Sequence, residues 1–179
     1  MTKVSDLPAD NAPSSDDYIV VNDSTSGQTK KVLLSDLITL TYANYPATAW
    51  ASWTPSWTNF TPSAATITAK YIQIGKTIHF SLIVTLSGST VSGVIGFSPP
   101  ATLASYYPAD TIITSNVKLL DTGISLNHGM ITVGSSTRLD FYAANSSSTY
   151  ITRTGTSSTV PHTWGNADVF SAFGTYESA

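Results

Sequence analysis

The three histidines are the residues of this chain that could most readily bind a metal ion. His79, His128 and His162 lie tens of positions apart, and none belongs to an H-x-H or H-E-x-x-H pattern. Zinc sites usually draw at least two ligands from one short stretch of chain. We therefore expect three unrelated histidines on polar faces, and neither a metal site nor a bound cofactor.

Paired carboxylates are the second group that could carry chemistry, because glycoside hydrolases place two of them on either side of the scissile bond. The acids after residue 53 are Asp110, Asp121, Asp140, Asp168 and Glu177. Asp140 and Asp168 fall on or at the edge of predicted strands, where a catalytic pair could sit. We instead expect Asp140 to face solvent beside Arg138, and Asp168 to begin the last strand.

No nucleophile or phosphate-binding motif accompanies these acids. The G-x-S-x-G elbow of many hydrolases and the G-x-x-x-x-G-K-[ST] phosphate loop are both absent. We therefore expect a protein that is not an enzyme. A polysaccharide depolymerase that uses Asp140 and Asp168 remains the alternative.

Aromatic side chains among Ser, Thr and Asn form the third group, since such rings stack on sugars or pack against a second subunit. The candidates for glycan or inter-subunit contact are Tyr106, Tyr107, Tyr142, Tyr150 and Trp164. Sequence alone does not decide whether the four tyrosines bind a partner or close the ends of the domain. For Trp50, Trp53 and Trp57 we expect packing.

The composition excludes several classes of protein. Charged residues make up 11% of the chain, against about 25% in typical soluble domains. The net charge is −3 and the basic residues are scattered, so we expect no nucleic-acid binding. The absence of cysteine excludes disulfides. No apolar run approaches the ~20 residues of a membrane helix and no secretory signal opens the chain, so we expect cytoplasmic synthesis without membrane insertion.

Residues 71–88 contain the clearest structural pattern. Apolar residues alternate strictly with mostly polar ones from Thr77 to Leu86, which is typical of a half-buried strand. Gly75 and Lys76 provide a turn to a preceding strand at 71–74. We expect the Ile78-Phe80-Leu82 face to line the core, and the His79-Ser81 face to lie outside or between subunits.

Further strands are predicted around this hairpin. They cover residues 65–74, 76–86, 91–97, 111–120, 129–133, 137–143 and 168–176. Turn-rich clusters separate them at short intervals, as in antiparallel all-β domains. The prediction is an all-β protein whose residues 53–179 form an antiparallel β-sandwich or jelly roll.

The first forty residues have a different organisation. Residues 1–17 are extended and acidic, 18–21 and 29–33 form a predicted hairpin, and Ser35 caps a short helix at 36–40. Such a unit is too small to hold a core alone. We assign residues 1–41 to an N-terminal segment that needs a partner surface, and residues 42–52 to a linker.

Two stretches resemble bacteriophage structural proteins. Residues 4–37, V-S-D-L-P-A-D-N-A-P-S-S-D-D-Y-I-V-V-N-D-S-T-S-G-Q-T-K-K-V-L-L-S-D-L, resemble the N-terminal attachment segment of phage fibre and appendage proteins. The remainder, from Trp53-Thr54-Pro55 through Y-I-Q-I-G-K-T-I-H-F-S to A-F-G-T-Y-E, is similar to a β-sandwich module common at the C-terminal end of phage fibres.

The resemblance implies a homotrimer located in the virion, with the N-terminus on other virion proteins (capsid, collar or tail) and the β domain facing host surface polysaccharide. The implied attachment residues are Leu7, Pro8, Tyr18, Ile19, Val20, Val21, Lys31, Val32 and Leu37. No coiled-coil heptads form a shaft, which favours a compact head fibre, decoration protein or short tail appendage over a long fibre. A cellular lectin-like module unrelated to phage is a second alternative.

Overall fold

The computed structural model describes residues 14, 16–22, 25–37, 49–146 and 151–179. The chain divides into two compact units, Met1–Pro46 and Ala47–Ala179. Strands dominate the described residues of both, so the prediction of an all-β protein is confirmed.

The smaller unit contains one antiparallel hairpin. β1 (Tyr18–Asn22) pairs with β2 (Thr29–Leu33), with Tyr18 opposite Leu33. Residues 34–37 are helical and follow β2 directly. Ser35 therefore lies inside the helical turn, and its predicted role as the cap is wrong: the amide of Leu34 instead donates to the carbonyl of Asp17 at 2.8 Å. The predicted residues 38–40 lie outside the described residues.

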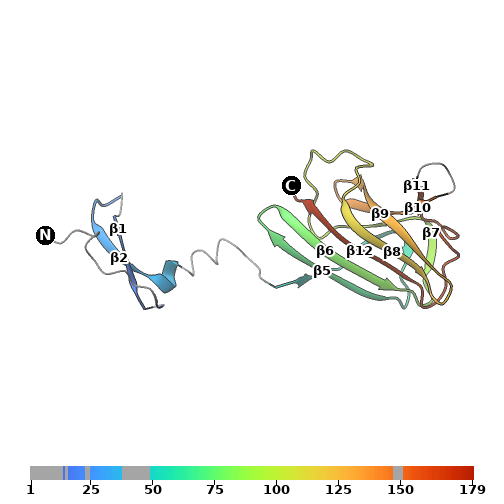
Figure 1. The fold of residues 1–179 in the computed structure, drawn as a ribbon, viewed down its shortest axis with the longest axis horizontal. Coiled ribbons are helices and arrows are strands. Elements are labelled where there is room, and N and C mark those ends of the chain that lie inside the picture. The colour runs from blue at the N-terminus through green and yellow to red at the C-terminus, as the bar shows by residue number, and fades with distance from the viewer. Residues whose placement is uncertain (1–13, 15, 23–24, 38–48, 147–150) are drawn as a thin grey trace. The chain divides into compact units, whose positions relative to one another are not determined.

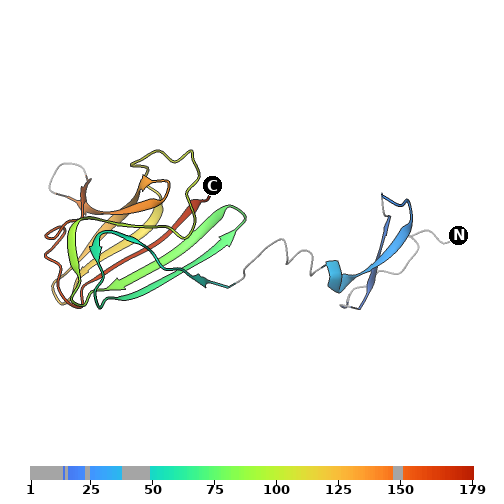
Figure 2. The ribbon, with the colours of Figure 1, turned by 180° about the vertical axis from the view of Figure 1, so that it is seen from behind.

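The larger unit is one antiparallel sheet that curls around its own core into a half-barrel (Figures 1 and 2). The order across the sheet is β3-β5-β6-β12-β8-β9-β10-β7-β4, and β11 pairs with the far end of β10. The strands are β3 (Ala51–Ser52), β4 (Trp57–Thr61), β5 (Thr66–Ile74), β6 (Thr77–Thr85), β7 (Thr90–Phe97), β8 (Thr114–Asp121), β9 (Ser125–Ser135), β10 (Arg138–Asn145), β11 (Thr152–Gly155) and β12 (Val169–Glu177).

The predicted strands of the larger unit are all present, with shifted ends. β9 begins at Ser125, before the predicted start at residue 129, and β8 begins at Thr114 rather than at residue 111. Residues 51 and 52, which the sequence assigns to a linker, pair with Tyr71 and Lys70 of β5 as the short strand β3. Short edge strands such as β3 and β11 depend on a neighbour and carry little periodic signal of their own.

The β5–β6 hairpin has the predicted form. Its register runs from Ile74 opposite Thr77 to Thr66 opposite Thr85. Gly75 sits in the turn with a φ of +60°, a conformation that side chains disfavour. The alternating apolar residues of β6 are buried, which confirms that this face lines the core.

Aromatic rings fill the core inside the curled sheet. Phe80, Phe97, Phe141 and Phe170 are fully buried and contact one another at centroid distances of 5.2–6.0 Å. Trp57 packs edge-to-face on this cluster, 5.9 Å from Phe170, and Trp53 packs on Phe80. Packing is therefore confirmed for Trp53 and Trp57. Trp50, by contrast, is 50% exposed.

The close approach of β6 and β12 requires a glycine. Gly174 lies opposite Phe80, and a Cβ added to Gly174 would lie 2.7 Å from the Phe80 ring. Trp53 and Tyr176 pack on other sides of that ring. The ring therefore has no free space to move into.

We expect Gly174→Ala to lower the free energy of unfolding by about 1–3 kcal/mol, the usual cost of overpacking a core. Urea unfolding measures the change. The matched control is Gly165→Ala, whose Cβ would meet Asp168 at an ordinary 3.7 Å, and we expect a change within about 0.5 kcal/mol there. Equal losses in the two variants would contradict this account of Gly174.

Candidate functional site

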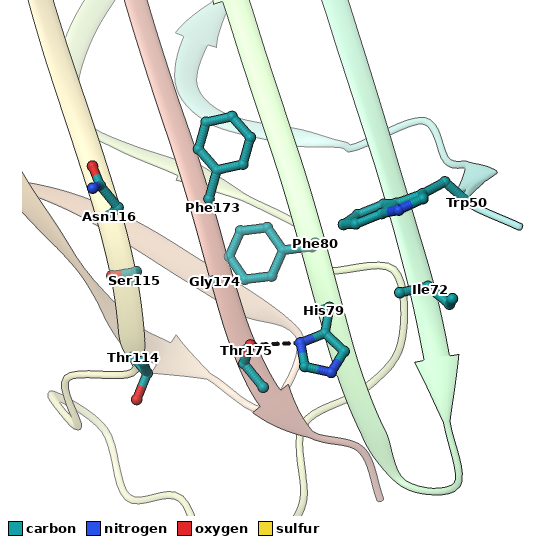
Figure 3. Close-up of a pocket in the computed structure, with 10 residues that line it drawn as sticks. All are labelled: Trp50, Ile72, His79, Phe80, Thr114, Ser115, Asn116, Phe173, Gly174 and Thr175. Carbon is teal, nitrogen blue, oxygen red and sulfur yellow. Dashed lines mark hydrogen bonds between the residues drawn. The ribbon is translucent and has the colours of Figure 1, made fainter. Parts of the chain in front are cut away.

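The outer face of β5, β6, β12 and β8 carries a groove of about 650 Å³ (Figure 3). We call it the outer groove. Residues of all four strands line it, together with the tryptophan that precedes β3: Trp50, Ile72, His79, Phe80, Thr114, Ser115, Asn116, Phe173, Gly174 and Thr175. Phe80 belongs to the core, whereas the lining side chains at outward positions, such as Phe173, point away from the core and are free to contact another molecule.

Phe173 is exposed because of the register of its strand. It occupies an outward position of β12, between Ser81 of β6 and Asn116 of β8. Both neighbours are small and polar, so they cover little of the ring, and Phe173 stays 48% exposed. The register thus presents an aromatic face to solvent in the middle of the sheet.

Trp50 provides the second aromatic ring of the outer groove. The pairing of β3 with β5 fixes the chain next to it, and Figure 3 shows the Trp50 ring beside Ile72 of β5. Half of this tryptophan is accessible. Trp50 and Phe173 therefore give the groove two apolar surfaces of the kind on which sugar rings stack.

Polar side chains surround these rings. The imidazole Nδ1 of His79 lies 2.9 Å from the hydroxyl of Thr175, within hydrogen-bond distance (Figure 3). Thr114 and Asn116 of β8 are exposed on the same face. The groove thus offers hydroxyl, amide and imidazole groups, all of which can hydrogen-bond to sugar hydroxyls.

A second hollow of about 320 Å³ lies next to the first. Trp50, Lys70, Ser81 and Phe173 line it, so the two hollows share their aromatic residues. Lys70 of β5 faces Ser81 of β6, which in turn faces Phe173 of β12. We call this the Lys70 hollow. The two hollows together form a continuous concave surface on one face of the sheet.

The tyrosines proposed for glycan contact from the sequence lie elsewhere. Tyr106 and Tyr107 are stacked with centroids 4.8 Å apart, and both bind Glu177. The hydroxyl of Tyr106 donates to the Glu177 carboxylate at 2.5 Å, and this hydrogen bond raises the pKa of Tyr106. The Tyr107 hydroxyl accepts from the Glu177 amide. This pair therefore fastens a surface loop to the end of β12.

The other candidates do not join the groove either. Trp164 donates to the carbonyl of Ser157 at 2.8 Å and packs its ring on Phe170. Tyr142 lies under the guanidinium of Arg153, 4.8 Å from ring centroid to Cζ. Tyr150 lies outside the described residues. The structure thus does not gather the described candidates into one site.

Asp140 is buried, which corrects the expectation that it faces solvent. Its partner is the expected one: Arg138 Nε lies 2.9 Å from its carboxylate. Burial raises the pKa of Asp140, and the hydrogen bond and charge of Arg138 act against that rise. Sequence spacing correctly pairs the two residues. The burial was not predictable, because it depends on tertiary packing: the carboxylate lies against Gly96 of β7 and Gly134 of β9.

Asp168 precedes β12 and is also buried. Its carboxylate accepts hydrogen bonds from the amides of Gly165, at 2.7 Å, and Thr122, at 2.9 Å. In the sheet, β8 and β9 separate β12 from β10, so Asp168 and Asp140 are not neighbours. The two carboxylates do not form the pair that a glycosidase requires, and each serves a structural role.

The histidines are separated in the fold as well. His79 lines the outer groove, and His128 faces Lys118 across the β8–β9 ladder. His162 is buried with its Nε2 3.7 Å from Asp168, too far for a hydrogen bond. Within the described part of the chain, no group of three His, Asp or Glu side chains could hold a metal ion.

Phe173 is the main groove residue that sequence reasoning missed. In the alternating sequence of β12 it occupies the same series of positions as Ser171 and Thr175, which are polar. A large apolar residue among polar positions of a strand indicates an exposed contact residue, because a residue selected for burial would stand among the apolar positions. This signal was present in the sequence and could have identified the site.

In comparisons with known proteins, no family model, curated protein or solved structure matches the chain. None of the helical residues that the structure describes forms a segment long and apolar enough to cross a bilayer.

Tyr176 holds the surface loop that carries Tyr106 and Tyr107. Its hydroxyl donates to the carbonyl of Ala101 at 2.7 Å and accepts from the Ala101 amide at 3.0 Å. Burial raises the pKa of Tyr176 to about 12. A raised folded-state pKa means that the stability contributed by Tyr176 is complete below about pH 10, the unfolded value, and is lost as the pH rises toward about 12.

We expect Tyr176→Phe to cost about 1–3 kcal/mol at neutral pH, because it leaves the Ala101 groups without partners. The difference between native and variant protein should shrink between about pH 10 and about pH 12. Urea unfolding along a pH series measures both. A difference that stays constant across this range would show that Tyr176 does not titrate as described.

Proposed function

We propose that this chain is a non-enzymatic structural subunit of a bacteriophage virion, namely a short trimeric head fibre, decoration protein or tail appendage. Residues 1–41 attach it to other virion proteins, and the β domain binds glycans of the host surface in the outer groove. The observation that carries the binding role is the pair of exposed aromatic rings, Trp50 and Phe173, set among hydrogen-bonding side chains on a rigid sheet.

The groove has the features of a carbohydrate site. Sugar rings present both apolar C–H faces and hydroxyl edges, so a protein that binds them needs aromatic surfaces next to hydrogen-bonding groups. The outer groove offers both in one concavity. Its residues other than Trp50 lie on paired strands, which holds their positions before a ligand arrives.

The structural roles of Asp140 and Asp168 favour binding over catalysis. Arg138 neutralises the first, and backbone amides bind the second. Moving either carboxylate toward a substrate would break these contacts and leave buried groups unsatisfied.

The N-terminal hairpin supports attachment to a partner. In β1, Tyr18 and Val20 are 56% and 71% exposed, and Ile19 and Val21 on the opposite face are also accessible. Lys31 places its ammonium over the Tyr18 ring, 4.6 Å from its centroid, and is exposed, as is Leu37, while Val32 is half-buried. A two-stranded hairpin with apolar side chains on both faces is marginal alone and gains stability from a partner surface. Leu7 and Pro8 lie outside the described residues.

Glycan binding is tested with the full-length chain on an array of purified bacterial surface polysaccharides. We expect binding to at least one of them, and we expect Trp50→Ala and Phe173→Ala each to weaken it about tenfold, because stacking on an aromatic ring is lost. The matched control is Ile124→Ala, an 81% exposed residue in the β8–β9 turn outside the groove. No binding to any polysaccharide would refute the glycan-binding role.

Assembly of the chain into a trimer through its N-terminal hairpin is tested by the mass of the purified protein in solution. We expect light scattering to give a trimer for the full-length chain and a smaller species after Val20→Asp, because a charge in the exposed apolar hairpin opposes its burial against another chain. Ile124→Asp makes the same change on the β domain and should leave the trimer intact. A monomeric full-length chain would contradict the proposed assembly.

A further inference from the structure

Lys70 stands at one end of the concave surface. It is exposed on β5 and lines the Lys70 hollow with Trp50, Ser81 and Phe173. No hydrogen bond or ion pair joins its ammonium to any of the described residues. Its register neighbours across the sheet, Ser81 and then Phe173, are uncharged, so its charge stays available to a ligand lying on the aromatic rings.

The charge of the whole outer face is unusual for this protein. The chain has a net charge of −3. The outward positions of β5, β6, β8 and β12 nevertheless carry Lys70, Lys118 and His79. The one acid among these positions is Glu177, at the end of β12, and Tyr106 already binds its carboxylate. The outer face of these four strands therefore carries two lysines and one carboxylate in a chain of negative net charge, and Lys70 is the lysine that lines a hollow.

We infer that the glycan bound in the outer groove is acidic, with a carboxylate-bearing sugar such as a uronic or sialic acid seated in the Lys70 hollow. The inference rests on the proposed glycan binding and adds the substrate class. One sugar ring stacks between Trp50 and Phe173, and its neighbour places a carboxylate at the Lys70 ammonium. The polar end of the groove, with His79, Thr175 and Asn116, binds the hydroxyls of the uncharged part of the chain.

The same charge pattern disfavours a second copy of this chain as the occupant. Packing this face against its own copy would place the lysines of both copies in one interface, and like charges oppose association. A free acid to neutralise them is missing from the outward positions of these strands. An acidic polysaccharide supplies the missing negative charge.

In the decisive experiment, each bacterial polysaccharide is printed on the array in two forms. One is the native polysaccharide, and the other has its carboxylates chemically reduced to alcohols. We expect the full-length chain to bind a native acidic polysaccharide three- to tenfold more tightly than its reduced form. The difference should disappear when NaCl is raised from about 0.01 M to about 1 M, because the Debye length falls from about 30 Å to about 3 Å.

Lys70→Gln should remove the preference, lowering affinity for the native acidic form to that for the reduced form while leaving the latter unchanged. Lys118→Gln is the matched control, since it removes the same charge from the same face outside both hollows. Equal effects of the two variants would show general attraction to a basic face and would overturn the role of Lys70.

The remaining outcomes separate the inference from the proposed function. Binding that is insensitive to carboxylate reduction overturns the acidic ligand and leaves glycan binding standing. Failure to bind any polysaccharide in either form overturns both. If light scattering gives a lower mass for Phe173→Ala than for the unsubstituted chain, the groove lies at an interface between copies of this chain. That result would also overturn the inference.

Discussion

The ladder between β6 and β12 is the constraint on which the rest of the larger unit depends. It aligns Phe80 with Gly174 and Ile78 with Tyr176, so that the core aromatic rings of both strands lie on the inner face. Residue 174 must be a glycine, because a Cβ at this position would clash with the Phe80 ring. Since side chains alternate along a strand, this alignment fixes every outward residue as well: a shift of one residue would move the core face into solvent.

The outer groove is a direct consequence of that alignment. The even-numbered residues of β12 face the core, so Phe173 and Thr175 must point outward. There they lie beside outward residues of the flanking strands, namely Ser81, His79, Thr114 and Asn116. The loop of Asp110, Thr111 and Ile113 extends the sheet at the edge of β9, where its backbone groups bond those of Ile131 and Val133. The outer face of β5, β6, β12 and β8 carries the exposed ring of Phe173. An exposed apolar surface of this kind is where a binding partner is expected.

The two buried carboxylates, Asp140 and Asp168, each have partners that fix local structure. Asp168 joins the turn after β8 to the segment before β12, and Asp140 holds Arg138 along the edge of β10. Buried carboxylates with complete sets of partners fix local geometry, because breaking one contact leaves an unpaired charge in a poorly hydrated place. Buried polar groups thus stabilise local structure, whereas the exposed aromatic and basic residues form the surface that we propose as the ligand-binding site.

The sequence by itself determined the all-β class, the β5–β6 hairpin, the buried face of β6 and the pairing of Asp140 with Arg138. These features follow from period-two alternation, a turn glycine and short spacing, all of which are local. The half-barrel order of the strands, the burial of Asp140 and the meeting of Trp50, Lys70 and Phe173 were decided by tertiary structure. Those residues lie far apart in the chain and become neighbours only through long-range ladders, whose register depends on how the whole core packs.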